Sequence, residues 1–264
     1  MPAPDTSDDC NTRFIPAATV VIFRHAASGG APELLMVQRS REMRFAGGAA
    51  VFPGGRVDPA DYVLAGVISP DTDLELAAAR IAGIRETLEE TGLVIAMRES
   101  VSVAEALAAR AMLLETGTLA PVLEHFGWTV EPERLTLYAH WCPPADKALA
   151  KAFDTRFFVT DLGTGAVDVA VDATENTRLF WTSAAHALEM ADAGEISVIF
   201  PTRRNLERLA QFATFDDALA CIARHPVQRI RPGRVDRDGE TWLEIPPGHG
   251  YPALGQPLAT AKRG

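Results

Sequence analysis

The chain has 264 residues, of which 47% are hydrophobic, and its formal net charge is −10. This composition predicts a globular protein with a sizeable core. The acidic balance argues against a general binder of nucleic acid or membrane surfaces, because both need a concentrated basic footprint.

The first 13 residues are polar and acidic, so we expect a flexible tail and no signal peptide. Cys10, Cys142 and Cys221 are widely separated and form no C-x-x-C pair, so neither a disulfide framework nor a zinc site is predicted. No stretch approaches the roughly 20 apolar residues of a membrane span. Together these features predict a cytoplasmic protein.

The N-terminal part of the chain predicts strands and turns. Branched and apolar residues favour strands over 17–24 and 33–39, which together suggest a hairpin, and a short strand over 49–52. That short strand enters a turn at Gly54 and Gly55. We expect residues 56–73, which contain Pro59 and Pro70, to form an irregular insertion.

A long central helix is predicted over 74–91. Asp71 or Asp73 can cap its start, and Gly92 can adopt the left-handed conformation that ends helices. Downstream, helices are expected over 102–116, 121–126, 183–193, 202–212 and 215–225. Strands are expected over 135–141, 156–160 and 178–181, with a terminal hairpin over 229–245. The elements together predict an α/β (α+β) fold, with a mixed sheet between helices and no linker separating domains.

The end of the central helix carries three glutamates: Glu86, Glu89 and Glu90. On a helix, Glu86 lies one turn from both of the others, so the three carboxylates repel one another. A hard divalent ion, Mg²⁺ or Mn²⁺, would relieve this repulsion and leave positions open for water and phosphate. The alternative is a solvated acidic helix face. Histidines show no ligand spacing.

The run from Arg85 to Gly92, with Gly54 and Gly55 upstream, resembles the box of the Nudix hydrolase superfamily. Its second half, Arg-Glu-x-x-Glu-Glu-x-Gly, matches in full. The first half departs from the pattern: 29 residues separate Gly55 from Arg85, where the family has 13, so about 16 are additional. Ala77 stands where the family has its first glutamate, and the nearest acid is Glu75.

An interrupted box of this kind is similar to the peroxisomal coenzyme A diphosphatases and their bacterial relatives. Downstream segments agree in order and spacing, including 140–144, 153–158 and 181–183. The resemblance covers roughly residues 16–215. It implies a Nudix-type α/β/α sandwich over 14–264 as a single domain, with a helical insertion at about 98–126 and a helical extension at about 183–225.

The resemblance also implies roles for individual residues. Glu86, Glu89 and Glu90 would bind the metal with the carbonyl of Gly55. Arg85 would orient a glutamate from behind, or be an ordinary exposed arginine. Glu175 would complete the metal site or act as the base, or be a solvated loop acid. Phosphate contacts are expected from arginines near the turn, with Arg39, Arg44 and Arg56 as the main candidates and Arg41 beside them. The alternative is that these arginines are surface charge.

The implied reaction is metal-dependent hydrolysis of a phosphoanhydride in a nucleoside diphosphate derivative. Coenzyme A or acyl-coenzyme A is the first candidate substrate, giving 3′,5′-ADP and a phosphopantetheine. ADP-ribose, a dinucleotide or a nucleoside triphosphate is the alternative, because the box contacts only the shared phosphates and metal. A non-catalytic ligand-sensing module is the third hypothesis. We expect a small-molecule nucleotide partner, no nucleic acid and no membrane, and the sequence leaves a homodimer open.

Overall fold

The computed structural model describes residues 14–26, 29–39, 48–143, 152–163 and 176–261. The strands are β1 (Ile15–Arg24), β2 (Glu33–Arg39), β3 (Ala50–Val51), β4 (Gly54–Arg56), β5 (Thr136–Trp141), β6 (Phe153–Asp161), β7 (Asn176–Ser183), β8 (Arg229–Ile230), β9 (Gly233–Arg237), β10 (Glu240–Glu244) and β11 (Gly255–Pro257). The helices are α1 (Pro59–Ile68), α2 (Leu74–Thr91), α3 (Val103–Thr116), α4 (Leu119–Phe126), α5 (Ala184–Asp192), α6 (Phe200–Leu209) and α7 (Phe215–Arg224), with a 3-10 helix η1 (Pro132–Arg134).

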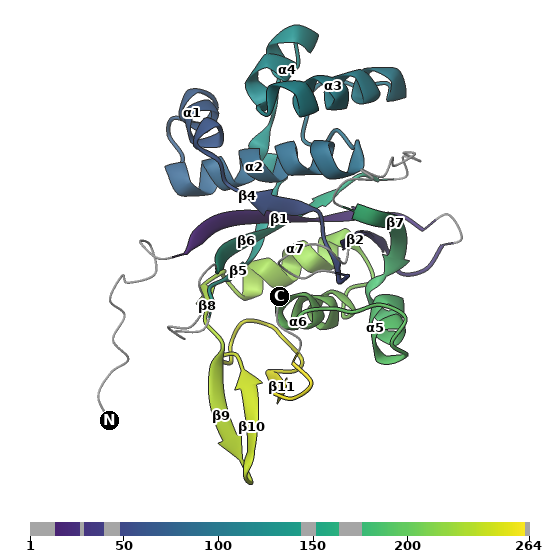
Figure 1. The fold of residues 1–264 in the computed structure, drawn as a ribbon, viewed down its shortest axis with the longest axis vertical. Coiled ribbons are helices and arrows are strands. Elements are labelled where there is room, and N and C mark those ends of the chain that lie inside the picture. Colours follow the sequence, from purple (N-terminus) through teal and green to yellow (C-terminus); the bar gives the residue numbers. More distant parts are fainter. Residues whose placement is uncertain (1–13, 27–28, 40–47, 144–151, 164–175, 262–264) are drawn as a thin grey trace.

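A mixed sheet of eight strands divides the molecule into two layers (Figure 1). Its path is β3-β2-β1-β6-β5-β8, with β4 beside β1 and β7 beside β2. β1 runs parallel to β6, and its other edge is shared between β2 and β4. The predicted hairpin of the first two strands is therefore confirmed only near its turn, where Phe23 faces Leu34 and Arg24 faces Glu33.

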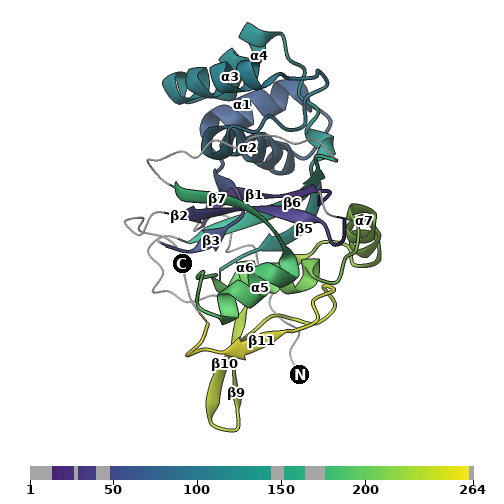
Figure 2. The same cartoon turned by 90° about the vertical axis from the view of Figure 1, so that its right-hand side faces the viewer.

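Helices cover both faces of the sheet (Figure 2). We call the face covered by α1–α4 the upper layer and the face covered by α5–α7 the lower layer. In the upper layer, Ile81 and Leu88 of α2 share a buried apolar cluster with Phe158 of β6. In the lower layer, Leu206 of α6 shares a second cluster with Phe23 of β1. The predicted α+β class with a mixed sheet is confirmed.

Helix α2 has the bounds that its sequence predicts. The Asp73 side chain accepts a hydrogen bond from the Leu76 N–H at its start, and Gly92 ends it in the left-handed conformation with φ 74°. The buried face includes Ile81, Ile84 and Leu88. The helix therefore lies fixed on the sheet, and the glutamates at its end have a defined place.

The prediction for residues 56–73 is wrong, because this insertion contains helix α1. Pro59 stands at the first helical position, where its missing N–H costs nothing and its fixed φ favours a helix. Asp58 and Asp61 form a capping box around the same turn. Pro59 thus starts a helix here rather than breaking one.

The C-terminal hairpin is confirmed as β9 and β10, joined at Asp238 and Gly239, which have φ values of 52° and 84°. None of the described helices combines the length and the apolar character needed to cross a membrane. Cys221 is free and buried, whereas Cys142 is disulfide-bonded. The prediction of no disulfide is therefore wrong at Cys142. The single-domain organisation stays a prediction.

Candidate active site

The two glycines that open β4 lie against the end of α2. The Gly54 N–H donates a hydrogen bond to Glu90 Oε2 at 3.0 Å. A Cβ at position 55 would stand 2.3 Å from Glu86 Oε1, so the site has no room for a side chain there. The structure thus brings the backbone of Gly55 into contact with the Glu86 carboxylate.

Arg85 lies behind these carboxylates and is only 3% exposed. Its guanidinium makes a two-pronged ion pair with Asp61: Nε donates to Oδ1 and Nη2 to Oδ2, both at 3.0 Å. Nη1 donates to Glu86 at 3.0 Å and to Glu89 at 3.4 Å, and Nη2 also donates to the carbonyl of Arg56 at 2.9 Å. Burial lowers the pKa of Arg85, but hydrogen bonds and charges from Asp61 and Glu86 raise it above its usual value. Arg85 therefore stays charged and joins α1, β4 and α2.

Asp61 is a residue that the sequence analysis missed. It is 2% exposed, and it also accepts a hydrogen bond from the Asp58 N–H at 2.9 Å. Glu75, the acid nearest the family's first glutamate position, instead accepts from the Tyr62 hydroxyl at 2.9 Å. The inserted helix α1 thus supplies the carboxylate that pairs with Arg85. The capping-box spacing of Asp58 and Asp61, together with Pro59 at the first helical position, is the sequence signal that could have marked this turn.

The three glutamates differ in their exposure to solvent. Glu90 is 5% exposed, while the side chains of Glu86 and Glu89 are 15% and 37% exposed. Burial raises the pKa of Glu86 to about 7; the charge on Arg85 opposes this rise and the charge on Glu89 adds to it. Negative charge is therefore destabilised at Glu86, and a nearby cation would stabilise it.

The donor set fits a hard divalent cation, since carboxylates and a carbonyl are the ligands that Mg²⁺ and Mn²⁺ prefer. The close approach of Gly55 to Glu86 puts the backbone of β4 beside the Glu86 carboxylate. Within the described residues, no three acidic, histidine or cysteine side chains converge closely enough to hold an ion as they stand. Instead, Glu86 and Glu89 pair with Arg85, and Glu90 accepts from Gly54.

The predicted phosphate-binding arginines are only partly described. Arg56 follows the glycines in β4, and its side chain is 62% exposed and 3.4 Å from Asp58. Arg39 is half-buried at the end of β2, where its N–H donates to the carbonyl of Ala49 at 3.0 Å. Both therefore lie on the strands that frame the turn. Arg44 and Glu175 lie outside the described residues.

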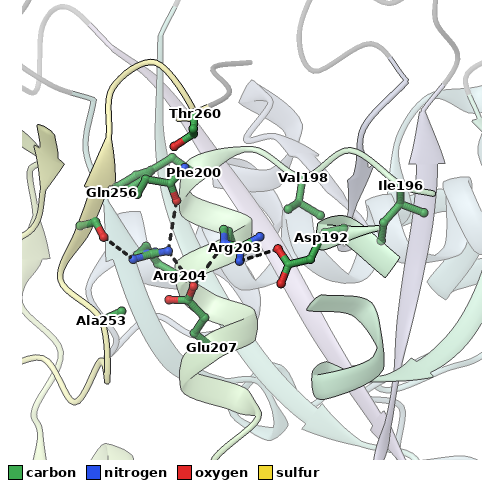
Figure 3. A pocket seen from close by; sticks show the side chains of 12 residues that line it. Asp192, Ile196, Val198, Phe200, Arg203, Arg204, Glu207, Ala253, Gln256 and Thr260 are labelled. Carbon is green, nitrogen blue, oxygen red and sulfur yellow. Dashed lines mark hydrogen bonds and ion pairs between the residues drawn. The ribbon is translucent and has the colours of Figure 1, made fainter. Parts of the chain in front are cut away.

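A cavity of about 360 Å³ lies in the lower layer, between α5, α6 and the segment around Gly255 (Figure 3). Its charged side chains are paired with one another: Arg203 binds Asp192 at 2.8 Å, and Arg204 binds Glu207 at 2.6 Å. The helices α5 and α6, which line the cavity, lie on the face of the sheet opposite α2 (Figure 2). It is therefore separate from the glutamates.

Comparison with known proteins identifies similar sequences and folds. No family model matches the chain. It is 26% identical over 265 residues to the acyl-coenzyme A diphosphatase NUDT19 of Gallus gallus, covering 81% of this chain and 68% of that protein. It also resembles the solved structure of a NUDIX hydrolase from Alicyclobacillus acidocaldarius. The TM-score is 0.66 and the identity 27%, over 78% of this chain and 96% of that one. In sequence and fold the chain therefore resembles Nudix hydrolases, a superfamily that generally depends on divalent metal, and among them the coenzyme A diphosphatase branch.

Proposed function

We propose that this Nudix hydrolase cleaves the diphosphate of coenzyme A or acyl-coenzyme A. The products are 3′,5′-ADP and phosphopantetheine, or its acylated form. Glu86, Glu89, Glu90 and the carbonyl of Gly55 hold Mg²⁺ or Mn²⁺. The observation that carries this proposal is the contact of the glycine strand with α2, where Glu86 and Glu90 meet Gly55 and Gly54.

The chain's own residues account for most of the required chemistry. A bound divalent ion supplies charge that polarises the phosphoryl oxygens and acidifies water. Arg85, held by Asp61, orients Glu86 and Glu89 and reduces their mutual repulsion. In the reaction, a water oxygen bonds to phosphorus and the bridging P–O bond breaks. The leaving phosphate keeps the electron pair, and Glu175 takes the proton from water.

The arginines around the turn complete the proposed site. Arg56, with its exposed side chain, contacts the diphosphate, and Arg39 and Arg44 add further positive charge. Forked guanidinium donors match phosphate oxygens in pairs. The overall acidity of the chain makes these local arginines necessary for an anionic substrate.

The choice of coenzyme A rests on two supports: the interrupted box with its downstream segments, and the likeness to a diphosphatase described as acting on acyl-coenzyme A. The box itself contacts only phosphate and metal, so it is equally compatible with ADP-ribose, dinucleotides or nucleoside triphosphates. The intact triad of Glu86, Glu89 and Glu90 argues for catalysis over ligand sensing, because sensing does not require it.

A substrate panel tests the proposal. The purified chain is incubated with Mg²⁺ or Mn²⁺ and with coenzyme A, an acyl-coenzyme A, ADP-ribose, NADH or a nucleoside triphosphate, and the products are identified by mass spectrometry. We expect the highest kcat/KM with coenzyme A or its thioester and no turnover after chelation. Reaction in ¹⁸O-water shows which phosphorus is attacked. A higher kcat/KM with ADP-ribose than with coenzyme A would identify ADP-ribose as the substrate. No turnover with any compound would favour a ligand-sensing role.

A further inference from the structure

The last turn of α2 concentrates negative charge. The final carbonyls of a helix lack partners within it, and this end carries the negative pole of the helix dipole. Here the same turn also bears Glu89 and Glu90, and α2 has no basic residue of its own in that turn. Acidic side chains are unfavourable at a helix C-terminus. A cation from elsewhere in the fold would therefore stabilise it.

Arg110 of α3 supplies that cation. Its Nε donates to the carbonyl of Glu89 at 2.9 Å, and its Nη2 donates to the carbonyl of Glu90 at 3.4 Å. Arg110 is 8% exposed, so these hydrogen bonds are shielded from water. The neighbouring Ala109 and Leu113 are buried, which fixes the side of α3 that carries Arg110.

We propose that Arg110 is a positioning residue for the metal site. Arg110 holds the backbone carbonyls of Glu89 and Glu90 in place. Because the carbonyl and the side chain of a residue are attached to the same Cα, Arg110 also restricts the position from which each carboxylate side chain extends. This inference rests on the proposed function, in which Glu89 and Glu90 hold the metal. It assigns the inserted helix α3, outside the box, a part in the reaction.

The chain offers a matched control on the same helix. Arg80, in the N-terminal half of α2, donates from Nε to the carbonyl of Leu135 at 3.1 Å. This is also an arginine-to-carbonyl hydrogen bond that anchors α2, but it lies away from the glutamates. Losing it should cost stability of α2 without altering the place of Glu89 and Glu90.

The experiment compares Arg110→Met, Arg110→Lys and Arg80→Met with the unmodified chain. Mn²⁺ affinity is measured by titration calorimetry without nucleotide, alongside melting temperature, kcat and KM. Methionine keeps the apolar stem of the buried arginine but removes its donors. We expect Arg110→Met to raise the Kd for Mn²⁺ by about 10- to 100-fold, the usual cost of losing a residue that orients metal ligands. kcat should fall in parallel at subsaturating metal.

The conservative variant and the control separate positioning from general stability. Arg110→Lys keeps the positive charge but loses the forked guanidinium donors. Its Kd for Mn²⁺ should therefore lie between those of the unmodified chain and Arg110→Met. Arg80→Met should lower the melting temperature without changing the Kd. An unchanged Kd and kcat in both folded Arg110 variants would overturn the inference while leaving the proposed function standing. If the unmodified chain bound no Mn²⁺, the proposed metal site itself would be wrong.

Discussion

The two layers of the molecule each bury an arginine, but they use it differently. In the upper layer, Arg85 is 3% exposed and its donors meet carboxylates of Asp61, Glu86 and Glu89. In the lower layer, Arg208 of α6 is 2% exposed. Its guanidinium donates to the carbonyl of Tyr138 at 3.0 Å and lies 4.3 Å from the centre of that tyrosine ring.

This contrast separates a structural buried charge from a functional one. Arg208 ties α6 to β5 through a carbonyl and aromatic faces, and such contacts hold two elements together. Arg85 instead gathers like-charged groups beside a glycine strand that packs directly against Glu86. A buried charge alone therefore does not identify the site; the gathering of several carboxylates around it does.

The largest expected effect comes from breaking the buried pair in the upper layer. Asp61→Ala should lower the free energy of unfolding by about 3–5 kcal/mol, because it leaves Arg85 buried without its two-pronged partner. Urea denaturation measures this loss. Asp58→Ala is the control: its carboxylate is 38% exposed and 3.6 Å from Arg85, so the cost should be about 0.5–2 kcal/mol, the usual range for losing an N-cap residue. Equal costs for both variants would contradict the central place given to Asp61.

Replacing one glutamate of the site should lower the turnover rate without unfolding the protein. Glu89→Gln is expected to lower kcat by roughly 10²- to 10³-fold, the range for losing one group that stabilises charge in a transition state. The unfolding midpoint should hardly change, since the Glu89 side chain is 37% exposed. Glu115→Gln, on the exposed face of α3, is the control and should leave kcat unchanged. Near-normal turnover in Glu89→Gln would refute the site.

The lower layer should respond in the opposite way. Arg208→Met is expected to cost about 1–3 kcal/mol of stability, because it leaves the carbonyl of Tyr138 without this donor and removes a cation from the ring. Measured at a temperature where the variant is folded, its kcat and its Kd for Mn²⁺ should match those of the unmodified chain. A changed Kd would show that the two layers are coupled.

The smallest effect concerns a charge cluster formed by Asp154 of β6, His140 of β5 and Arg229 of β8. Burial raises the pKa of Asp154, but its contact with His140 and the charge on Arg229 outweigh this and hold it below its usual value. Because the folded pKa is lowered, its stabilisation is present above the usual aspartate range, about 3.9, and is lost as the pH falls through the folded pKa. Asp154→Asn should therefore cost about 1 kcal/mol at pH 6, and this cost should shrink as the pH falls through the folded pKa. Denaturation midpoints across this range measure the difference, and a constant cost at all pH values would exclude a titration effect.

Local signals predicted the helix that matters most. The bounds of α2 were predicted from Asp73, from Gly92 and from the apolar spacing between them. The run of glutamates suggested a metal site without any tertiary information. The insertion before it was misjudged because Pro59 was given the role of a breaker, whereas a proline at the first helical turn favours a helix.

The supporting residues could not be predicted in the same way. Asp61 pairs with Arg85 across 24 positions, and Arg110 reaches the carbonyl of Glu89 across 21. Such partners meet only because α1 and α3 pack against α2, and no periodicity in the sequence encodes that docking. The glutamates can be recognised from their spacing in the sequence, whereas Asp61 and Arg110 can be identified only from the three-dimensional fold.

One backbone contact limits how small a working version of this enzyme can be. The Ala50 N–H donates to the carbonyl of Ser197 at 2.7 Å, so a segment from the last third of the chain is attached to the strand that leads into Gly54. A fragment truncated before position 195 would keep every box glutamate yet lose this anchor. Minimal catalysts cut from this chain should therefore be designed around Ser197 rather than around the box alone.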